Sequence, residues 1–205
     1  MLANLTITEY LERAAAGTAV PGGGSVAALN ACLAASLIEM VANLTIGKKG
    51  YDALEEEMKD VARKAAGLRK LLTASIDRDA DAYSEVMAAF KLPRATDREK
   101  ESRKSEIQKA FKQAAMVPLE VANQAVEVIY LAGIAVNSGN KNAVTDGVVA
   151  AMNARTAALS ALYNVKINLC SIEDDEFVQK LTREINDLEH QAKSAEQKIL
   201  ANLKI

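Results

Sequence analysis

The sequence has little of the chemistry that many enzymes use. Its 205 residues include one histidine, two cysteines, three prolines and no tryptophan. The lone His190 gives no support to a Ser-His-Asp triad or a histidine-rich metal site. Cys32 and Cys170 do not make a disulfide framework, and their apolar contexts favour two thiols in a reducing cytoplasm. No CxxC, GxGxxG or EF-hand spacing occurs. The chemistry must therefore come from carboxylates, lysines, amides and the backbone.

Aromatic residues are also scarce, at 4%, whereas alanine occurs 38 times. Because alanine is the best helix former and aromatic residues favour strands, this composition argues against a β-rich fold. A hydrophobic content of 50% and a net charge of -2 exclude a disordered chain. The 25 basic and 27 acidic residues create no global field for a polyanion, so we expect no nucleic-acid partner.

No uninterrupted apolar run approaches the roughly 20 residues of a membrane span, and the first residues lack the pattern of a signal peptide. We therefore expect a cytoplasmic protein with no membrane partner. The length fits one domain better than two, so we treat residues 1–205 as a single helical domain.

Capping boxes and helix breakers divide the chain into six helices. Thr6 and Glu9 form one capping box, and Thr96 and Glu99 form another. The expected helices lie at about 6–16, 25–45, 52–92, 96–138 and 142–169, and a last helix is capped by residues 171–174. The fold class predicted is all-α: a six-helix bundle with long antiparallel helices that forms a dimer.

The third helix carries the longest apolar stripe. Its first half has the 4-3 spacing of a bundle seam at Leu54, Met58, Val61, Ala65, Leu68 and Leu72. We expect the stripe to continue through Ile76, Ala80, Tyr83, Met87 and Phe90. Asp79 lies three residues after Ile76 and four before Tyr83, so it falls on this stripe. Burial on a core-facing stripe can raise the pKa of a carboxyl group, and a raised pKa suits a general base or acid.

Three further segments place polar groups where they interrupt apolar helices or open them. In the first, Pro21 to Ser25, glycines expose the backbone at a helix start, where free N–H groups attract anions. A tight turn that packs two helices closely is the alternative interpretation.

In the second segment, Glu39 and Asn43 share a face of an alanine-rich helix, and Lys48 follows its end. An ion pair for Glu39 and compensation of the helix dipole by Lys48 are the alternatives. The third segment runs from Gly139 to Asp146, where Asn142 and Asp146 open a helix. Ordinary N-capping by Asn142 and a first-turn acid at Asp146 are the alternatives there.

The sequence resembles the cyclodeaminase/cyclohydrolase family of folate enzymes, over nearly the whole chain and in order. The most specific matches are 21–29 (PGGGSVAAL) and 40–49 (MVANLTIGKK). Further matches are Asp79 with Ala82-Tyr83, Leu92-Pro93, Val117 to Glu120, Gly139-Asn140 with Asn142, Thr145-Asp146, Asn164-Val165 and Ile167-Asn168.

The resemblance implies an all-helical homodimer with a folate site in a cleft near the subunit interface. It implies action on the one-carbon unit of tetrahydrofolate, with a folate as substrate and partner and no resident cofactor. The methenyl carbon is already an electrophilic amidinium cation, so no metal is required. On this basis we assign Asp79 and Asp146 as base and charge stabiliser, and Lys48 as proton donor or oxyanion stabiliser.

The remaining candidates would bind substrate. Gly23, Gly24 and Ser25 would bind an oxygen of the ligand, and Glu39, Asn43 and Asn142 would hold polar atoms of the pterin or the one-carbon unit. Three functions stay open. The first is methenyltetrahydrofolate cyclohydrolase, because no formiminotransferase domain is fused to the chain given. The others are formiminotetrahydrofolate cyclodeaminase and, from a different class, a non-catalytic helical scaffold or folate carrier.

Overall fold

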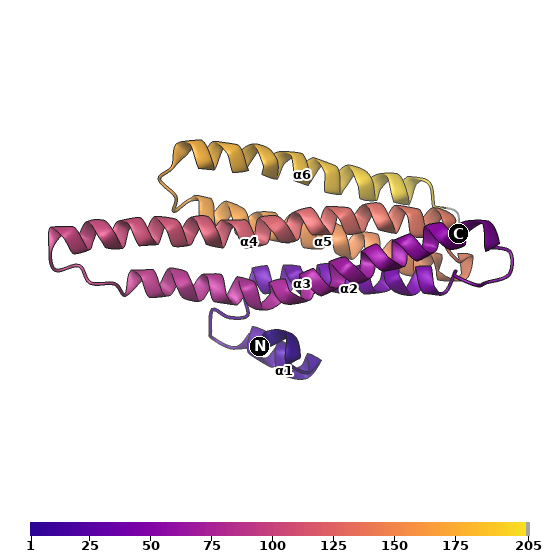
Figure 1. The fold of residues 1–205 in the computed structure, drawn as a ribbon, viewed down its shortest axis with the longest axis horizontal. Helices are drawn as coiled ribbons and strands as arrows, with labels where there is room; N and C mark the ends of the chain where they lie inside the picture. The colour runs from indigo at the N-terminus through magenta and orange to yellow at the C-terminus, as the bar shows by residue number, and fades with distance from the viewer. Residues whose placement is uncertain (204–205) are drawn as a thin grey trace.

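The computed structural model describes residues 1–203. Across these residues the chain forms six α-helices, three short 3-10 helices and no strand (Figure 1). The α-helices are α1 (Ile7–Ala15), α2 (Gly23–Asn43), α3 (Glu55–Phe90), α4 (Asp97–Ser138), α5 (Val144–Leu169) and α6 (Asp175–Ala201). The predicted all-α class and six helices are therefore confirmed.

The helix starts follow the capping chemistry of the sequence. Thr6 and Glu9 form a complete capping box at α1, and Thr96 and Glu99 form one at α4. In each box the threonine side chain accepts a hydrogen bond from the glutamate N–H, and the glutamate side chain accepts from the threonine N–H. Pro118 lies buried inside α4 without ending it.

Four long helices form the body of the protein. Helix α2 packs on α3 and α5, α4 packs on the same two helices, and α6 lies against α4 and α5. Short connections join successive long helices, so each runs antiparallel to the one before it (Figure 1). Helix α1 stands on the opposite side of the bundle from α6.

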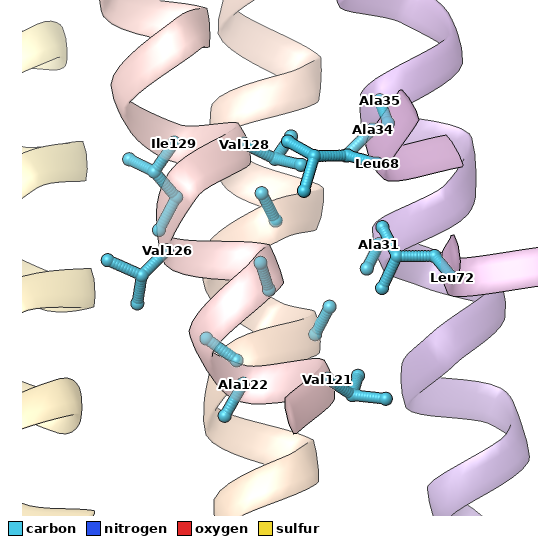
Figure 2. Close-up of a cluster of buried hydrophobic side chains, with 14 of the residues drawn as sticks. Ala31, Ala34, Ala35, Leu68, Leu72, Val121, Ala122, Val126, Val128 and Ile129 are labelled. Carbon is cyan, nitrogen blue, oxygen red and sulfur yellow. The ribbon is translucent and has the colours of Figure 1, made fainter. Parts of the chain in front are cut away.

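Alanine makes up most of the contact between the central helices. The alanines with no exposed surface on α2 and α5 are Ala27, Ala28, Ala31, Ala34, Ala35, Ala42, Ala150, Ala151, Ala154, Ala157, Ala158 and Ala161. Larger residues from the flanking helices, such as Leu68 and Leu72 of α3 and Val121 of α4, fill the space around them (Figure 2). Small side chains let the helix axes approach closely, which brings the start of α2 against α3.

The apolar stripe of α3 differs from the prediction in its second half. The 4-3 spacing continues without interruption, so the seam positions after Leu72 are Ser75, Asp79, Ala82, Val86 and Ala89. Of these, all except the partly buried Asp79 are buried, whereas Tyr83, Met87 and Phe90 are about 40% exposed. Our prediction chose the residue after each seam position, where Ile76 is buried and Ala80 is partly buried as predicted, but the last three residues are exposed. Asp79 therefore occupies a seam position itself.

Two helices are more apolar than we expected. By length and composition alone, α2 and α4 could each cross a membrane. About half of each apolar window is buried against other helices, and core helices of a water-soluble bundle also have this character.

Candidate active site

A cleft at the start of α2 collects residues from four segments of the chain. Its volume is about 410 Å³. Its lining residues are Ala19, Val20, Gly22, Gly23 and Gly24 from the loop and start of α2, Asp79, Tyr83, Val86 and Phe90 from α3, Phe111 from α4, and Asn164, Ile167 and Asn168 from α5. The glycine segment and Asp79, which the sequence analysis selected separately, therefore meet at one place.

Asp79 lies directly against the first turn of α2. A Cβ atom built on Gly24 would fall 2.0 Å from Asp79 Oδ1, so only glycine leaves room for the carboxyl group at this distance. Ser25 Oγ lies 3.1 Å from Asp79 Oδ2 and donates a 2.9 Å hydrogen bond to the carbonyl oxygen of Ile76. The side chain of Asp79 is thus held between two helices.

Two opposing effects act on the Asp79 carboxyl. Burial raises its pKa above the ordinary value of 3.8, because the charged form loses hydration. Hydrogen bonds from the hydroxyl and N–H of Ser25 favour the charged form and lower the pKa. Burial is the larger effect, so the net shift is upward. Such a carboxyl is a stronger base than an exposed aspartate, as general base catalysis near neutral pH requires.

The rest of the cleft is lined by aromatic rings and by side-chain amides. Phe90 and Phe111 meet edge to face, with ring centroids 6.0 Å apart at 80°. Asn164 donates its amide N–H to the carbonyl of Ser160, and Asn168 donates to Ala114, which fixes both amide planes. We had assigned Phe90 to the helix seam. The spacing of Asn164 and Asn168, four residues apart on one face of α5, was the signal that could have identified them.

The other predicted residues gather at the far end of α2. Lys48 Nζ donates a 2.8 Å hydrogen bond to Asn140 Oδ1, which also accepts from the N–H of Asn142. The short turn Lys141–Ala143, capped by Asn140, leads directly into α5, where Asp146 lies in the first turn. Asn140, not Asn142, is therefore the capping residue. Asn43, the last residue of α2, is exposed at this same end.

Glu39 lies one helical turn before Asn43, on the same face of α2. Its carboxylate pairs with the guanidinium of Arg69 on α3, with Arg69 Nε 2.7 Å from Glu39 Oε2. The ion pair that we left open as the alternative for Glu39 is therefore present, and its contact with a pterin stays a prediction.

A single chain does not bring all the predicted site residues together. Helix α2 has 21 residues, which span about 30 Å at 1.5 Å per residue. Gly23, Gly24, Ser25 and Asp79 lie at its start, and Asn43, Lys48, Asn142 and Asp146 lie at or beyond its end. A single folate ring system cannot contact both groups within one chain.

A larger cavity lies outside both groups. It has about 960 Å³ and lies between the end of α3 and the first half of α4. Its charged lining residues, among them Glu85, Glu106, Lys109 and Lys112, carry both signs. It contains none of the predicted site residues, so we place the candidate active site at the smaller cleft, where a buried carboxyl is available for chemistry.

The close approach of Gly24 to Asp79 predicts the effect of adding one methyl group. We expect Gly24→Ala to lose most of the protein's activity and to destabilise the fold by about 1–3 kcal/mol, because the new Cβ displaces the carboxyl. Gly67→Ala is the matched control. Gly67 lies inside α3 with open space around it, so this change should keep activity and stability or raise stability slightly. Denaturant unfolding and turnover of both variants test this. An active, stable Gly24→Ala protein would contradict the geometry.

The raised pKa of Asp79 predicts how stability depends on pH. Between 3.8 and the higher native value, the native state binds the proton more strongly than the unfolded state, so this residue's contribution to stability falls as pH rises. Asp79→Asn removes this penalty. We expect the variant to gain stability over the original protein as pH increases above 3.8, as measured by urea unfolding from pH 3 to 8. A stability advantage that shrinks over this range would contradict the burial argument.

Comparison with known proteins agrees with the motifs. The Formiminotransferase-cyclodeaminase family profile matches residues 6–187. A methenyltetrahydrofolate cyclohydrolase of Methylorubrum extorquens is 39% identical over 204 residues, covering 100% of this chain and 98% of that protein. The formimidoyltransferase-cyclodeaminase of Rattus norvegicus is 32% identical over 98% of this chain, which spans only 37% of the rat protein.

The fold has a solved counterpart. The crystal structure of a formiminotetrahydrofolate cyclodeaminase from Thermotoga maritima superimposes with a TM-score of 0.88 at 30% identity, covering 97% of this chain and 96% of that one. These comparisons identify the same family that the sequence motifs and the helical fold indicated. This chain belongs to the formiminotransferase-cyclodeaminase family of folate one-carbon enzymes.

Proposed function

We propose that the chain hydrolyses 5,10-methenyltetrahydrofolate to 10-formyltetrahydrofolate. The substrate carries a cationic N–C–N unit that closes a ring between N5 and N10. Water adds to the central carbon with loss of a proton, and the bond from that carbon to N5 then breaks while N5 gains a proton. The product is a neutral formamide at N10, and one proton is released overall.

Asp79 is the group that supports this reaction most strongly. Its partly buried carboxyl lies in the cleft with a raised pKa, held by Gly24 and Ser25. In our proposal the carboxylate accepts a proton from the attacking water and then donates it to N5 as the ring opens. Its negative charge also stabilises the cationic substrate before attack.

The rest of the cleft suits a flat heterocycle. Phe90, Phe111 and Tyr83 give an apolar wall against which a pterin ring can stack. Asn164 and Asn168 provide amide groups for its polar edge, and the start of α2 provides N–H groups. We also propose that the protein acts in the cytoplasm, with the folate as substrate and with no resident cofactor or membrane partner.

Cyclodeamination of 5-formiminotetrahydrofolate is the second candidate. It is favoured by the structural likeness to the Thermotoga maritima protein. In that reaction N10 attacks the formimino carbon and ammonia leaves, so the same carboxyl would protonate the leaving nitrogen. The full-length likeness to the Methylorubrum extorquens cyclohydrolase favours hydrolysis for this chain. A non-catalytic scaffold or carrier is the third alternative, which gives the residues of the cleft no chemical role.

The proposed role of Asp79 predicts the outcome of an activity assay. We expect the purified protein to accelerate loss of the 5,10-methenyltetrahydrofolate chromophore over the spontaneous rate. Asp79→Asn should lower kcat by about 10²–10⁴-fold, since a general base is lost. Asp81→Asn on the same helix is the matched control, because Asp81 is exposed and should not affect turnover.

Each outcome of this assay has a definite meaning. Ammonia release from 5-formiminotetrahydrofolate without hydrolysis would replace the first candidate by the second. No reaction with either substrate would leave the non-catalytic scaffold or carrier as the remaining candidate function. Normal turnover by a folded Asp79→Asn protein would remove Asp79 from the mechanism.

We also propose that the protein is a homodimer formed along α2 and α5. Three apolar residues of α2 and its C-cap residue, at intervals of seven, seven and four, are 37–50% exposed: Val26, Leu33, Met40 and Leu44. The neighbouring helix α5 exposes Val149, Met152, Tyr163 and Ile167. Rows of large apolar side chains at helical spacing are typical of a surface that packs against another helix.

A two-fold axis across the middle of α2 would explain why the predicted residues lie at two ends. Because such an axis is perpendicular to α2, the two copies of the helix run antiparallel, and residue contacts across the interface are reciprocal. The start of α2 in one subunit then faces the end of α2 in its partner. Asp79 of one subunit and Asp146 of the other would serve the same folate.

The antiparallel dimer predicts complementation between two inactive variants. We expect Asp79→Asn and Asp146→Asn each to be inactive alone. When they are unfolded together and refolded, half of the dimers are mixed, and each mixed dimer contains one intact site. Activity should therefore return to about a quarter of that of the original protein.

Two measurements accompany this experiment. Light scattering before mixing should give a dimer near twice 21.9 kDa. No recovery of activity in the mixed dimers would mean that each site lies within one subunit, and a monomer at working concentration would reject the dimer itself. An active Asp146→Asn homodimer would show that Asp146 takes no part.

A further inference from the structure

Asn168 lies in the wall of the cleft, near the end of α5. Its amide nitrogen donates a 3.1 Å hydrogen bond to the carbonyl oxygen of Ala114 on α4. The same nitrogen donates a 2.9 Å hydrogen bond to the carbonyl oxygen of Asn164, one turn earlier on α5. A side-chain amide nitrogen has only two N–H groups. The protein itself therefore uses both donors of Asn168.

The side-chain oxygen of Asn168 is the polar atom that remains for a ligand. It accepts no hydrogen bond among residues 1–203, and the buried side-chain atoms without a partner there belong to Tyr10 and Gln124. The Asn168 oxygen is thus neither paired nor buried. Only the amide nitrogen can bond to two carbonyl oxygens, which fixes the orientation of the group. Asn168 therefore offers the cleft a hydrogen-bond acceptor and no donor.

Asn164 relates this acceptor to the start of α2. A Cβ atom built on Gly23 would fall 3.3 Å from Asn164 Nδ2, so the Asn164 amide lies beside the same turn that meets Asp79 through Gly24. Helix α5 runs antiparallel to α2 (Figure 1). Asn168 consequently lies one helical turn, about 6 Å, beyond Asn164 and past the start of α2. The cleft has Asp79 at one end and the Asn168 acceptor further along.

The polar edge of a pterin has a matching order of groups. Its 4-oxo group, an acceptor, lies beside N5, and the N3–H and 2-amino groups, both donors, follow around the ring. The first N–H groups of a helix have no partner within it, so the turn at Gly23 and Gly24 offers donors. The cleft thus presents donors next to Asp79 and an acceptor one turn away.

We propose that the side-chain oxygen of Asn168 accepts a hydrogen bond from the 2-amino group of the pterin. This inference rests on the proposed function for the identity of the ligand. With the one-carbon unit at Asp79, the 4-oxo group meets the N–H groups of Gly23 and Gly24, and the 2-amino group extends toward Asn168. Asn168 is then a specificity-determining residue, since a ring without this donor leaves its oxygen unpaired.

Asn168→Ser removes the acceptor and keeps a local hydrogen bond. A helical serine donates to the carbonyl four residues earlier, as Ser36 and Ser84 do here, so the bond to the Asn164 carbonyl is retained. We expect the Kd for 5-formyltetrahydrofolate, measured by calorimetry, to rise about tenfold. The original protein should bind the 2-desamino-2-methyl analogue about tenfold more weakly than 5-formyltetrahydrofolate. Asn168→Ser should weaken binding of the analogue by less than about twofold, because both changes remove the same hydrogen bond.

Asn123→Ser is the matched control. Asn123 makes the same bond to the carbonyl four residues earlier, but it is exposed on α4 and lies outside the cleft. This variant should leave both dissociation constants unchanged.

The outcomes distinguish failure of this inference from failure of the proposed function. Equal loss of affinity for the two ligands in Asn168→Ser would make the residue structural and overturn the contact, even if the original protein hydrolyses its substrate. If Asn168→Ser does not fold, the original protein decides: equal affinity for the two ligands rejects the contact, and about tenfold weaker binding of the analogue retains it. Loss confined to 5-formyltetrahydrofolate, in a protein that neither hydrolyses nor releases ammonia, would keep the contact and reject the catalysis. No binding of either ligand would reject both.

Discussion

The contact between the Asp79 carboxyl and the first turn of α2 is the constraint on which the proposed site depends. A carboxyl can lie this close to a helix start only where residue 24 has no side chain, since a Cβ would fall 2.0 Å from Oδ1. At that position hydrogen bonds from Ser25 favour the charged carboxylate, while burial opposes it more strongly. The result is a carboxyl that is held in place by its neighbours and yet is more basic than an exposed one. This combination is useful for moving a proton and is unfavourable for stability alone.

The alanine-rich core makes this contact possible. Because α2 and α5 meet their neighbours mainly through alanine, the backbone of α2 comes close enough to α3 for residues 24 and 79 to touch. Each alanine buries little apolar area, so a stable core requires many such contacts and therefore long helices. Helices α3 and α4 have 36 and 42 residues. Long helices in turn separate the two polar ends of α2 by about 30 Å. The same packing that forms the cleft thus leaves Lys48 and Asp146 far from it within one chain.

Much of the fold could be predicted from sequence because its signals are local. Two capping boxes, the glycine segment before α2 and the break after Ser138 define helix ends through neighbouring residues alone. Asp79 could be selected because a charge on an apolar stripe is visible in the sequence. Our prediction placed the stripe wrongly after Leu72, because Tyr83 and Phe90 are larger and more hydrophobic than Ser75 and Ala82. The uninterrupted 4-3 spacing was the better guide. Phe111 was not predicted, because its place in the cleft depends on which helices meet, and periodicity carries no such information.

Direct titration of the Asp79 carboxyl tests the central claim. Carboxyl carbons of isotopically labelled aspartate can be followed by NMR from pH 2 to 8, with Asp79→Asn identifying the signal. The structure predicts a native midpoint for Asp79 above 3.8, because burial outweighs the hydrogen bonds from Ser25. A midpoint at or below 3.8 would mean that the carboxylate is fully stabilised at the helix start. Asp79 would then be a structural cap for α2, and the proposed proton transfer would lose its base.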